Sequence, residues 1–377
     1  MNLKPFPRIR QFKIWYLILF TMFFVFTFNG FSLANDNESL YKGNIRVIEG
    51  IPFLKLYGTY YEMGIQYGNL LKEPLLEVQE KIFPYKTNVS TGEFYQHLKY
   101  NMPVKYQDFL KGVSKSAGIS YENLLIGSFY EFTNAGCSSV LVKMDSDGSS
   151  YLMHAKNRDA NNGKNQIIIE FNPEKGYKYL ITATIGALFI HEGINEKGIS
   201  VTGNAAPKSN YKVKKWPQDD IYQMILESAH SLDEVDKIIN KYKSDYAEIL
   251  TVGSSYENNG TIYDLDNIKR VKHEMKDKKY LFVTNKFLSD DLTPQETRFN
   301  DPRYRAIKDF LENHSQNSVD DMIDLLATRP INNISTIHSI IFDGKKKDIY
   351  FAFSERYAAE AKWLKYNWIN DEIALFK

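Results

Sequence analysis

The sequence lacks a second cysteine: among its 377 residues Cys137 stands alone, so no disulfide can form within the chain. Proteins exported to oxidising compartments usually keep their cysteines in pairs. A lone thiol in such a protein is therefore either a small buried side chain or a working nucleophile. The N-terminus of this chain has the pattern of an export signal, so the residues around Cys137 must decide between the two interpretations.

Other absences narrow the class of protein. The chain has almost no surplus of charge, with 47 Lys and Arg against 46 Asp and Glu, which excludes the basic surface typical of nucleic-acid binding. It has no Gly-x-Ser-x-Gly elbow, no phosphate-binding glycine-rich loop and no pair of histidines at helical metal-ligand spacing. We therefore expect no cofactor and no metal. An aromatic content of 14% indicates a packed core rather than disorder.

Residues 1–34 predict a secretory signal peptide. Four basic residues precede an uncharged apolar run over residues 14–31, and the small-x-small tripeptide Ser32–Ala34 comes just before an acidic, polar stretch. These are the three regions of a cleavable signal. Because the apolar run is long for a signal peptide, a retained N-terminal membrane anchor is the alternative. In both cases we expect the rest of the chain to lie outside the cytoplasm.

The chain changes character at Cys137. Residues 35–136 have mainly helical periodicity, whereas the residues that follow form β-prone segments in short hairpin-like groups, with helices between the groups. This order predicts an α+β protein rather than alternating βαβ units. Two stacked antiparallel sheets covered by helices satisfy the burial pattern, and so does a single large sheet. Both arrangements stay open at this point.

A hairpin brings polar residues next to Cys137. With a turn at Asp145–Gly148, the returning strand places Lys156 opposite Cys137, and cross-strand partners lie about 5 Å apart. Lys156 or Arg158 would then stabilise a thiolate, and Asp159 would orient the group that takes the proton. The alternative is that Lys156, Arg158 and Asp159 form solvated ion pairs at a strand end.

A histidine-assisted cysteine protease is the competing arrangement. The sequence around Cys137 lacks the papain pattern, and no histidine stands in a recognisable signature. The seven histidines are His97, His154, His191, His230, His273, His314 and His338. Since histidines are more often surface or core residues than catalytic ones, we give none of them a role.

Four segments resemble one enzyme family. Gly136-Cys137-Ser138-Ser139, followed by a hairpin and Asn157-Arg158-Asp159, is similar to the start of the N-terminal-nucleophile cysteine hydrolases. Residues 58–68 resemble the Gly-x-x-x-Glu-x-Gly-x-x-x-Gly helix of the acyl-CoA:6-aminopenicillanate acyltransferase family, residues 193–204 resemble its Gly-x-Asn-x-x-Gly hairpin, and residues 283–285 resemble the strand end with its oxyanion-hole Asn. The wider family includes choloylglycine hydrolases, penicillin V acylases and acid ceramidases.

The resemblance implies a fold and a processing event. The fold is a four-layer αββα sandwich of two antiparallel sheets. The precursor would cleave itself between Gly136 and Cys137, where glycine offers no side chain to obstruct the attack. Residues 35–136 would stay docked as a helical α-chain, and residues 137–377 would form the β-chain that carries the catalytic core.

The resemblance also implies roles for individual residues. Cys137 would be the nucleophile, and its freed α-amine would be the general base, so that no histidine is required. Asp159 would hold the amine and the thiol in alignment. Asn285, together with Asn204, would donate hydrogen bonds to the tetrahedral oxyanion. Lys156 and Arg158 stay, on the hairpin spacing, the candidates to support the thiol from the neighbouring strand.

The sequence departs from the family at two positions. Lys156 stands where the choloylglycine and ceramidase branch carries Arg, and lysine is a point charge rather than a planar fork. Asn333 lies where the acyltransferase branch carries an Arg, just before its penultimate strand. Arg303, Arg305 and Arg329 are the candidates to replace that residue.

The sequence therefore predicts an exported, self-processing amidase. Its substrate would be a linear, non-peptide amide of a small-molecule acyl group, hydrolysed through an acyl-cysteine intermediate. An acyltransferase that uses the same intermediate is the nearest alternative. The alternative from another class is a non-catalytic exported binding protein on the same scaffold, with Cys137 unprocessed. We expect no nucleic-acid partner.

Overall fold

The computed structural model describes residues 42–82, 102–127, 136–146, 148–160, 163–187, 192–206, 219–241, 247–266 and 269–377. All of them belong to the unit Leu40–Lys377. The predicted signal peptide falls in the other unit, Met1–Ser39, and lies outside the described residues. No helix in the described ranges is long and apolar enough to span a membrane.

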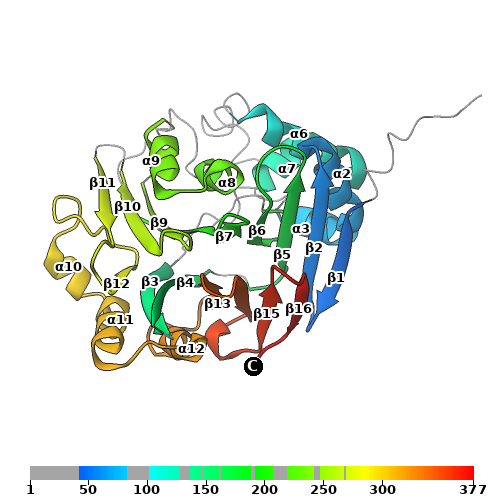
Figure 1. Cartoon of the computed structure of the whole chain (residues 1–377). Coiled ribbons are helices and arrows are strands. Elements are labelled where there is room, and N and C mark those ends of the chain that lie inside the picture. The colour runs from blue at the N-terminus through cyan, green and yellow to red at the C-terminus, as the bar shows by residue number, and fades with distance from the viewer. Residues whose placement is uncertain are drawn as a thin grey trace, which may run out of the picture. The chain divides into compact units, whose positions relative to one another are not determined.

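A nine-stranded sheet forms one of the two central layers (Figure 1). Its strands, in spatial order, are β1 (Asn44–Ile48), β2 (Ile51–Gly58), β5 (Gln166–Pro173), β6 (Tyr179–Thr184), β7 (Glu192–Asn195), β8 (Ile199–Ala205), β9 (Glu248–Ser254), β10 (Asn259–Leu265) and β11 (Arg270–Glu274). Every neighbouring pair is antiparallel except β2 and β5, which are parallel.

A seven-stranded sheet forms the other central layer. Its strands, in spatial order, are β12 (Tyr280–Val283), β3 (Gly136–Ser146), β4 (Ser149–Asp159), β13 (Thr336–Asp343), β14 (Asp348–Phe353), β15 (Trp363–Asn367) and β16 (Glu372–Leu375). All neighbouring pairs in this sheet are antiparallel. Cys137 thus lies on an inner strand, between β12 and β4.

Helices cover the outer face of each sheet (Figure 1). Those on the nine-stranded sheet are α2 (Tyr60–Leu70), α3 (Lys72–Ile82), α6 (Val104–Ala117), α7 (Tyr121–Gly127), α8 (Asp219–Ser228) and α9 (Leu232–Lys241). Near the seven-stranded sheet are α10 (Gln295–Phe299), α11 (Pro302–Asn313), α12 (Val319–Ala327) and the 3-10 helix η4 (Ala358–Glu360). The prediction of an α+β, four-layer αββα sandwich is confirmed, with one parallel pair in a sheet predicted to be antiparallel throughout.

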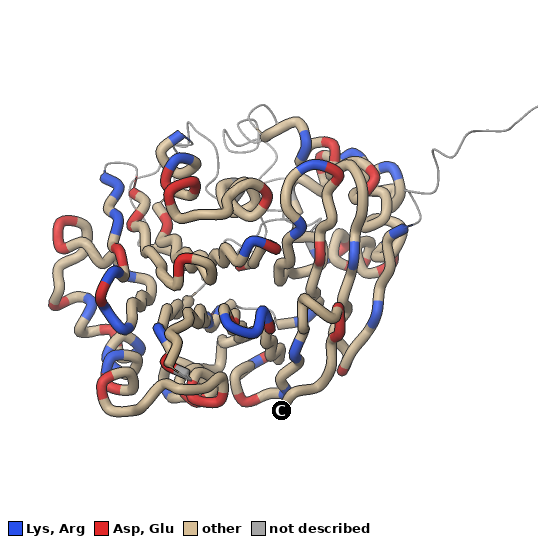
Figure 2. Tube along the Cα trace, viewed as in Figure 1, with Lys and Arg blue, Asp and Glu red and all other residues tan. Residues whose placement is uncertain are grey.

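Apolar side chains fill the space between the two sheets. One inter-sheet cluster joins Phe53 and Ile168 of the nine-stranded sheet to Phe351 of the seven-stranded sheet. A second joins Ile249 to Leu141. Hydrophobic burial on both faces explains why the central strands have almost no exposed positions. Charges of both signs are interspersed along the described chain (Figure 2).

The Gly-x-x-x-Glu-x-Gly-x-x-x-Gly segment has a structural explanation. Its glutamate closes a capping box with Thr59 at the start of α2. A Cβ on Gly64 would lie 2.1 Å from the Phe109 carbonyl oxygen, and one on Gly112 of α6 would lie 2.2 Å from the Tyr61 carbonyl oxygen. The two helices therefore cross with their backbones in contact, which only glycine permits.

The segment before Cys137 is less helical than predicted, because it begins with the strands β1 and β2. β2 pairs with β5, so that Phe53 lies beside Ile168 and Leu56 beside Phe171. A strand buried in a shared sheet cannot leave without exposing apolar surface on both sides. Through β1 and β2, the segment before Cys137 is therefore a part of the nine-stranded sheet.

Candidate active site

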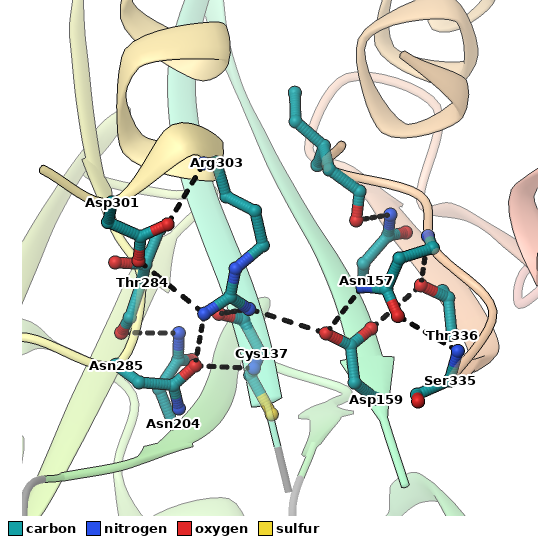
Figure 3. Close-up of polar contacts among 12 residues, drawn as sticks. Cys137, Asn157, Asp159, Asn204, Thr284, Asn285, Asp301, Arg303, Ser335 and Thr336 are labelled. Atoms are coloured by element: carbon teal, nitrogen blue, oxygen red, sulfur yellow. Dashed lines mark hydrogen bonds and ion pairs between the residues drawn. The ribbon is translucent and has the colours of Figure 1, made fainter. Parts of the chain in front are cut away.

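Cys137 is the second residue of β3, and only 4% of its surface is exposed. Two side chains hold its main chain (Figure 3). The Cys137 N–H donates to Asn285 Oδ1 at 2.8 Å, and its carbonyl oxygen accepts from Arg303 Nη1 at 3.1 Å. Polar groups from distant parts of the sequence thus gather on the backbone next to the Gly136–Cys137 peptide bond.

The register of the β3–β4 hairpin differs from the predicted one. Cys137 pairs with Arg158, and Lys156 pairs with Ser139. The prediction that Lys156 lies opposite Cys137 is therefore wrong by two residues, because β3 extends two residues further toward the turn than expected, to Ser146. Since directly paired residues in an antiparallel sheet share a face, Cys137 and Ser139 face the same side as Arg158 and Lys156.

Asp159 lies at the end of β4, next to Cys137. Its carboxylate accepts hydrogen bonds from Thr336 Oγ1 at 2.7 Å, Asn333 Nδ2 at 2.8 Å and Arg303 Nη1 at 3.3 Å. Burial raises the pKa of Asp159, although these three contacts act in the opposite direction. Gly136 faces the same carboxylate: a Cβ there would lie 2.8 Å from Asp159 Oδ2 and 3.2 Å from Arg303 Nη1.

Arg303 connects the groups around the nucleophile. It stands at the start of α11, where Asp301 caps the helix by accepting from the Arg303 N–H. Besides the Cys137 carbonyl and Asp159, its guanidinium donates to Asn285 Oδ1 at 2.8 Å. A planar fork with five N–H donors can bond three partners at once, which an ammonium group cannot do in this geometry.

The other two arginines considered as replacements for the family residue do not reach this point. Arg329 pairs with Glu360, and Arg305 donates to the carbonyl of Phe299. Of the three candidates, Arg303 is therefore the one whose side chain reaches Cys137. Asn333, where the acyltransferase branch has its arginine, contacts Asp159 with its own amide.

Asn204 and Asn285 form a reciprocal clamp between the ends of β8 and β12. The Asn204 amide nitrogen donates to the Thr284 carbonyl at 3.0 Å, and the Asn285 amide nitrogen donates to the Ala205 carbonyl at 2.8 Å. Each side chain thus bonds the backbone next to the other asparagine. In this conformation Asn285 presents its oxygen to Cys137, since both the Cys137 N–H and Arg303 donate to it.

Lys156 belongs to a buried ionic cluster between the sheets. Its ammonium donates to Glu192 Oε2 at 2.6 Å and to the Gly203 carbonyl at 2.7 Å. The second oxygen of Glu192 contacts His338, whose other ring nitrogen contacts Gln166. Although burial alone would raise the pKa of Glu192, Lys156 and His338 hold it well below its ordinary value.

The alternative of solvated ion pairs at a strand end is contradicted by burial. The exposed fractions of Lys156, Arg158 and Asp159 are 0%, 2% and 6%. Charged side chains are rarely buried to this degree unless they are paired. The three residues are therefore buried in the interior near Cys137. Lys156 and Arg158 lie on one face of β4, and Asp159 lies on the other.

The environment keeps the Cys137 thiol protonated. Burial raises its pKa, and Asp159 adds to the increase, while Lys156 opposes it. A buried thiol of this kind needs a base within reach before it can attack a carbonyl. Within the described part of the chain, no histidine forms a hydrogen bond with Cys137. In the same part, no cluster of three or more His, Cys, Asp or Glu could hold a metal ion.

The comparison with protein families gives one match. Residues 144–357, more than half of the chain, match the family described as acyl-coenzyme A:6-aminopenicillanic acid acyl-transferase. The chain belongs to this family. The resemblance to this family that the sequence segments indicated is confirmed.

Solved structures similar to this member of the acyl-transferase family share little sequence with it. An N-acylethanolamine-hydrolyzing acid amidase ortholog from Caenorhabditis elegans is 15% identical, with a TM-score of 0.47 over 55% of this chain and 93% of that one. A mutant conjugated bile acid hydrolase from Clostridium perfringens is 13% identical, with a TM-score of 0.47 over 64% and 96%. Penicillin V acylase from Agrobacterium tumefaciens is 13% identical, with a TM-score of 0.42 over 63% and 98%. The comparison with curated protein sequences finds no match.

The acyl-transferase match covers most of the site. Asp159, Asn204, Asn285 and Arg303 lie inside the matched residues, whereas Cys137 lies just before their first residue. The family assignment and the arrangement around the thiol are thus separate observations.

Proposed function

We propose that this protein is a self-processing amidase with Cys137 as its nucleophile. The observation that carries the proposal is the convergence of Asn285, Arg303 and Asp159 on the backbone at Gly136–Cys137, beside a buried thiol. A structural cysteine needs no such polar surroundings. Groups that hold the backbone at a peptide bond, rather than the thiol, suit a cysteine whose own peptide bond is the first substrate.

In the first reaction the Cys137 sulfur attacks the Gly136 carbonyl carbon. The C–N bond between the two residues breaks, the thiol proton passes to the nitrogen, and a thioester joins Gly136 to the sulfur. Water then adds its hydroxyl to the acyl carbon and returns a proton to the sulfur. The products are a carboxyl group on Gly136 and a free amine and thiol on Cys137.

In the second reaction the α-amine of Cys137 takes the thiol proton, and the sulfur attacks the amide carbonyl of the substrate. The free amine has an ordinary pKa near 8, suited to a base at neutral pH. Asn285 Oδ1, which accepts the Cys137 N–H, would hold this amine with its lone pair free. Asn204 is a candidate donor to the oxyanion. When the C–N bond breaks, the leaving amine takes the proton, and water hydrolyses the acyl-cysteine.

The substrate class we propose is a linear, non-peptide amide with a small-molecule acyl group. The family description favours a second candidate, transfer of the acyl group to an amine through the same acyl-cysteine. The ratio of hydrolysis to aminolysis products separates the two. We further propose that the protein works outside the cytoplasm, because residues 1–34 have the three regions of a signal peptide.

The decisive test is intact-mass analysis and N-terminal sequencing of the mature protein under denaturing conditions. We expect two chains, the larger beginning at Cys137, and a single uncut chain for Cys137→Ala. Ser138→Ala is the matched control and should be cut, because the buried Ser138 hydroxyl has no hydrogen-bond partner among the described residues. A wild-type protein that hydrolyses acyl p-nitroanilides as one unbroken chain would refute the proposal.

A further inference from the structure

A row of buried polar side chains runs between the sheets and ends at Asn204. Ser200, Thr202 and Asn204 occupy alternate positions of β8, so they share the face toward the seven-stranded sheet. From that sheet, His154 of β4 and Ser139 of β3 meet them. The distances are 2.8 Å from His154 Nδ1 to Ser200 Oγ and 2.9 Å from Nε2 to Thr202 Oγ1.

The row continues to the amide of Asn204. Thr202 Oγ1 lies 2.9 Å from Ser139 Oγ, and Ser139 Oγ lies 2.6 Å from Asn204 Oδ1. The Asn204 nitrogen lies 3.0 Å from the Thr284 carbonyl oxygen. His154, Ser139, Thr202 and Asn204 are each no more than 1% exposed, so water does not compete for these contacts.

The hydrogen atoms can be arranged along this row in one way. A carbonyl only accepts, so the NH₂ of Asn204 must face Thr284 and its oxygen must face Ser139. Ser139 then gives its single hydrogen to Asn204, and Thr202 gives its own to Ser139. With that hydrogen used, Thr202 can only accept from His154, which must carry its proton on Nε2.

His154 stays in this neutral form under ordinary conditions. Burial, together with the nearby Lys156, lowers its pKa to about 3. Its other nitrogen, Nδ1, is then a bare acceptor for the Ser200 hydroxyl. One tautomer and one direction of hydrogen bonding are thus the arrangement that satisfies every member of the row.

We propose that His154 is a positioning residue for the reaction proposed above: acting through Thr202 and Ser139, it fixes the direction of the Asn204 amide. The inference rests on the proposed function, since it assigns Asn204 a part in that reaction. His154 does not touch the reacting atoms. It orients a group that does, in the way that supporting hydrogen bonds orient other catalytic groups.

The clamp carries this orientation to the nucleophile. Asn204 bonds the Thr284 carbonyl, the next residue is Asn285, and Asn285 accepts from the Cys137 N–H. The Asn285 amide in turn bonds Ala205, which follows Asn204. A rotation of the Asn204 amide would therefore break the contact to Ser139 and loosen the clamp at the same time.

The tautomer is tested directly on the wild-type protein. Long-range ¹H–¹⁵N correlation spectra of protein labelled with ¹⁵N-histidine distinguish the two neutral tautomers and the imidazolium, and His154→Gln assigns the signal. We expect a neutral ring with its proton on Nε2 between about pH 5 and about pH 8, given the lowered pKa. A proton on Nδ1, or an imidazolium in this range, overturns the proposal.

The positioning role is tested with Thr202→Val, which keeps the shape of the side chain and removes its hydroxyl. Acylation of Cys137 by p-nitrophenyl hexanoate forms an oxyanion, whereas alkylation by iodoacetamide does not. We expect Thr202→Val to slow acylation at least about tenfold and to leave alkylation within about twofold. Thr202→Ser, which restores the hydroxyl, should recover most of the acylation rate.

Thr251→Val is the matched control. Thr251 pairs directly with Thr202 across β8 and β9, and its buried hydroxyl has no hydrogen-bond partner among the described residues. Cys137 of the Thr251→Val variant should be acylated at the wild-type rate. Equal loss of acylation and alkylation in Thr202→Val, or loss of neither, overturns the proposal. If Thr202→Val does not fold, the tautomer of the wild-type protein decides.

The proposed function fails in a different way from this inference. If wild-type Cys137 is alkylated but is never acylated and never cut from Gly136, the amidase proposal is refuted. The histidine spectrum still reports the direction of the hydrogen-bonded row in that case. Conversely, an active, processed enzyme with the Nδ1 tautomer keeps the proposed function and refutes the role of His154.

Discussion

Replacing His154 with glutamine changes how the stability of the protein depends on pH. Glutamine is neutral at every pH and can still hydrogen-bond to Ser200 and Thr202. His154, by contrast, is fully buried among hydroxyls and near Lys156, and its pKa falls from an ordinary 6.5 to about 3. The unfolded chain therefore binds a proton at His154 under conditions in which the folded chain does not.

The sign and size of the effect follow from linkage. Because the folded-state pKa is depressed, the stabilisation is complete above pH 6.5 and is lost as the pH falls from 6.5 toward 3. When the pH falls from about 8 to about 5, protonation of His154 in the unfolded chain should lower the unfolding free energy of the protein by about 2 kcal/mol. The glutamine variant lacks this loss, so the stability difference between the two proteins should narrow by about that amount.

The assay is urea unfolding at several pH values, followed by tryptophan fluorescence. Both proteins should carry Cys137→Ala, so that the chain stays uncut and unfolding remains unimolecular. Buried His338 also has a lowered pKa, but it is present in both proteins and cancels in the difference. A stability difference that stays constant within about 0.5 kcal/mol from pH 8 to pH 5 would show that His154 titrates normally and would refute the reasoning.

Three further substitutions test the site. Gly136→Ala should slow self-cleavage at least about tenfold in a gel time course, because its Cβ would lie 2.8 Å from Asp159 Oδ2; an unchanged rate would contradict the contact. Arg303→Lys should slow both self-cleavage and acylation about tenfold, since a single ammonium nitrogen cannot span the acceptors that the two terminal nitrogens of the guanidinium reach; full activity would show that the fork is dispensable. Lys156→Met should cost about 3–5 kcal/mol of unfolding free energy by taking the lysine partner away from the buried carboxylate of Glu192, and adding Glu192→Gln should recover much of it in urea unfolding.

Local sequence patterns predicted the local structure well and the long-range pairing poorly. The alternation after Cys137 and the turn near Gly148 identify the β3–β4 hairpin, because its partners lie close together in the sequence. The pairing of β2 with β5 joins residues more than a hundred positions apart, and no short pattern records it. For the same reason the helical periodicity of residues 35–136 does not reveal that β1 and β2 are strands.

The site divides in the same way. Motifs identified Cys137, Asp159 and Asn285, which the structure brings together through direct contacts and through Arg303. Arg303 itself was one of three candidates, because its approach depends on where α11 begins, at the Asp301 cap. The alternate polar residues of β8 are a signal that the sequence does contain, since a fully buried strand has little reason to carry a row of hydroxyls and amides.

The buried polar groups between the sheets are better explained by a role in aligning the two sheets than by a contribution to stability. A buried ion pair such as Lys156–Glu192 is often no more stabilising than apolar residues of similar volume, and apolar clusters already fill the neighbouring space. Apolar contacts are also nondirectional, so they define the alignment of the two sheets less sharply than hydrogen bonds do. The site takes Cys137 and Asp159 from one sheet and Asn204 from the other, and its geometry fails if they slide. We infer that the directional bonds of Lys156, Glu192 and the His154 row fix the two sheets in the one alignment in which these groups meet.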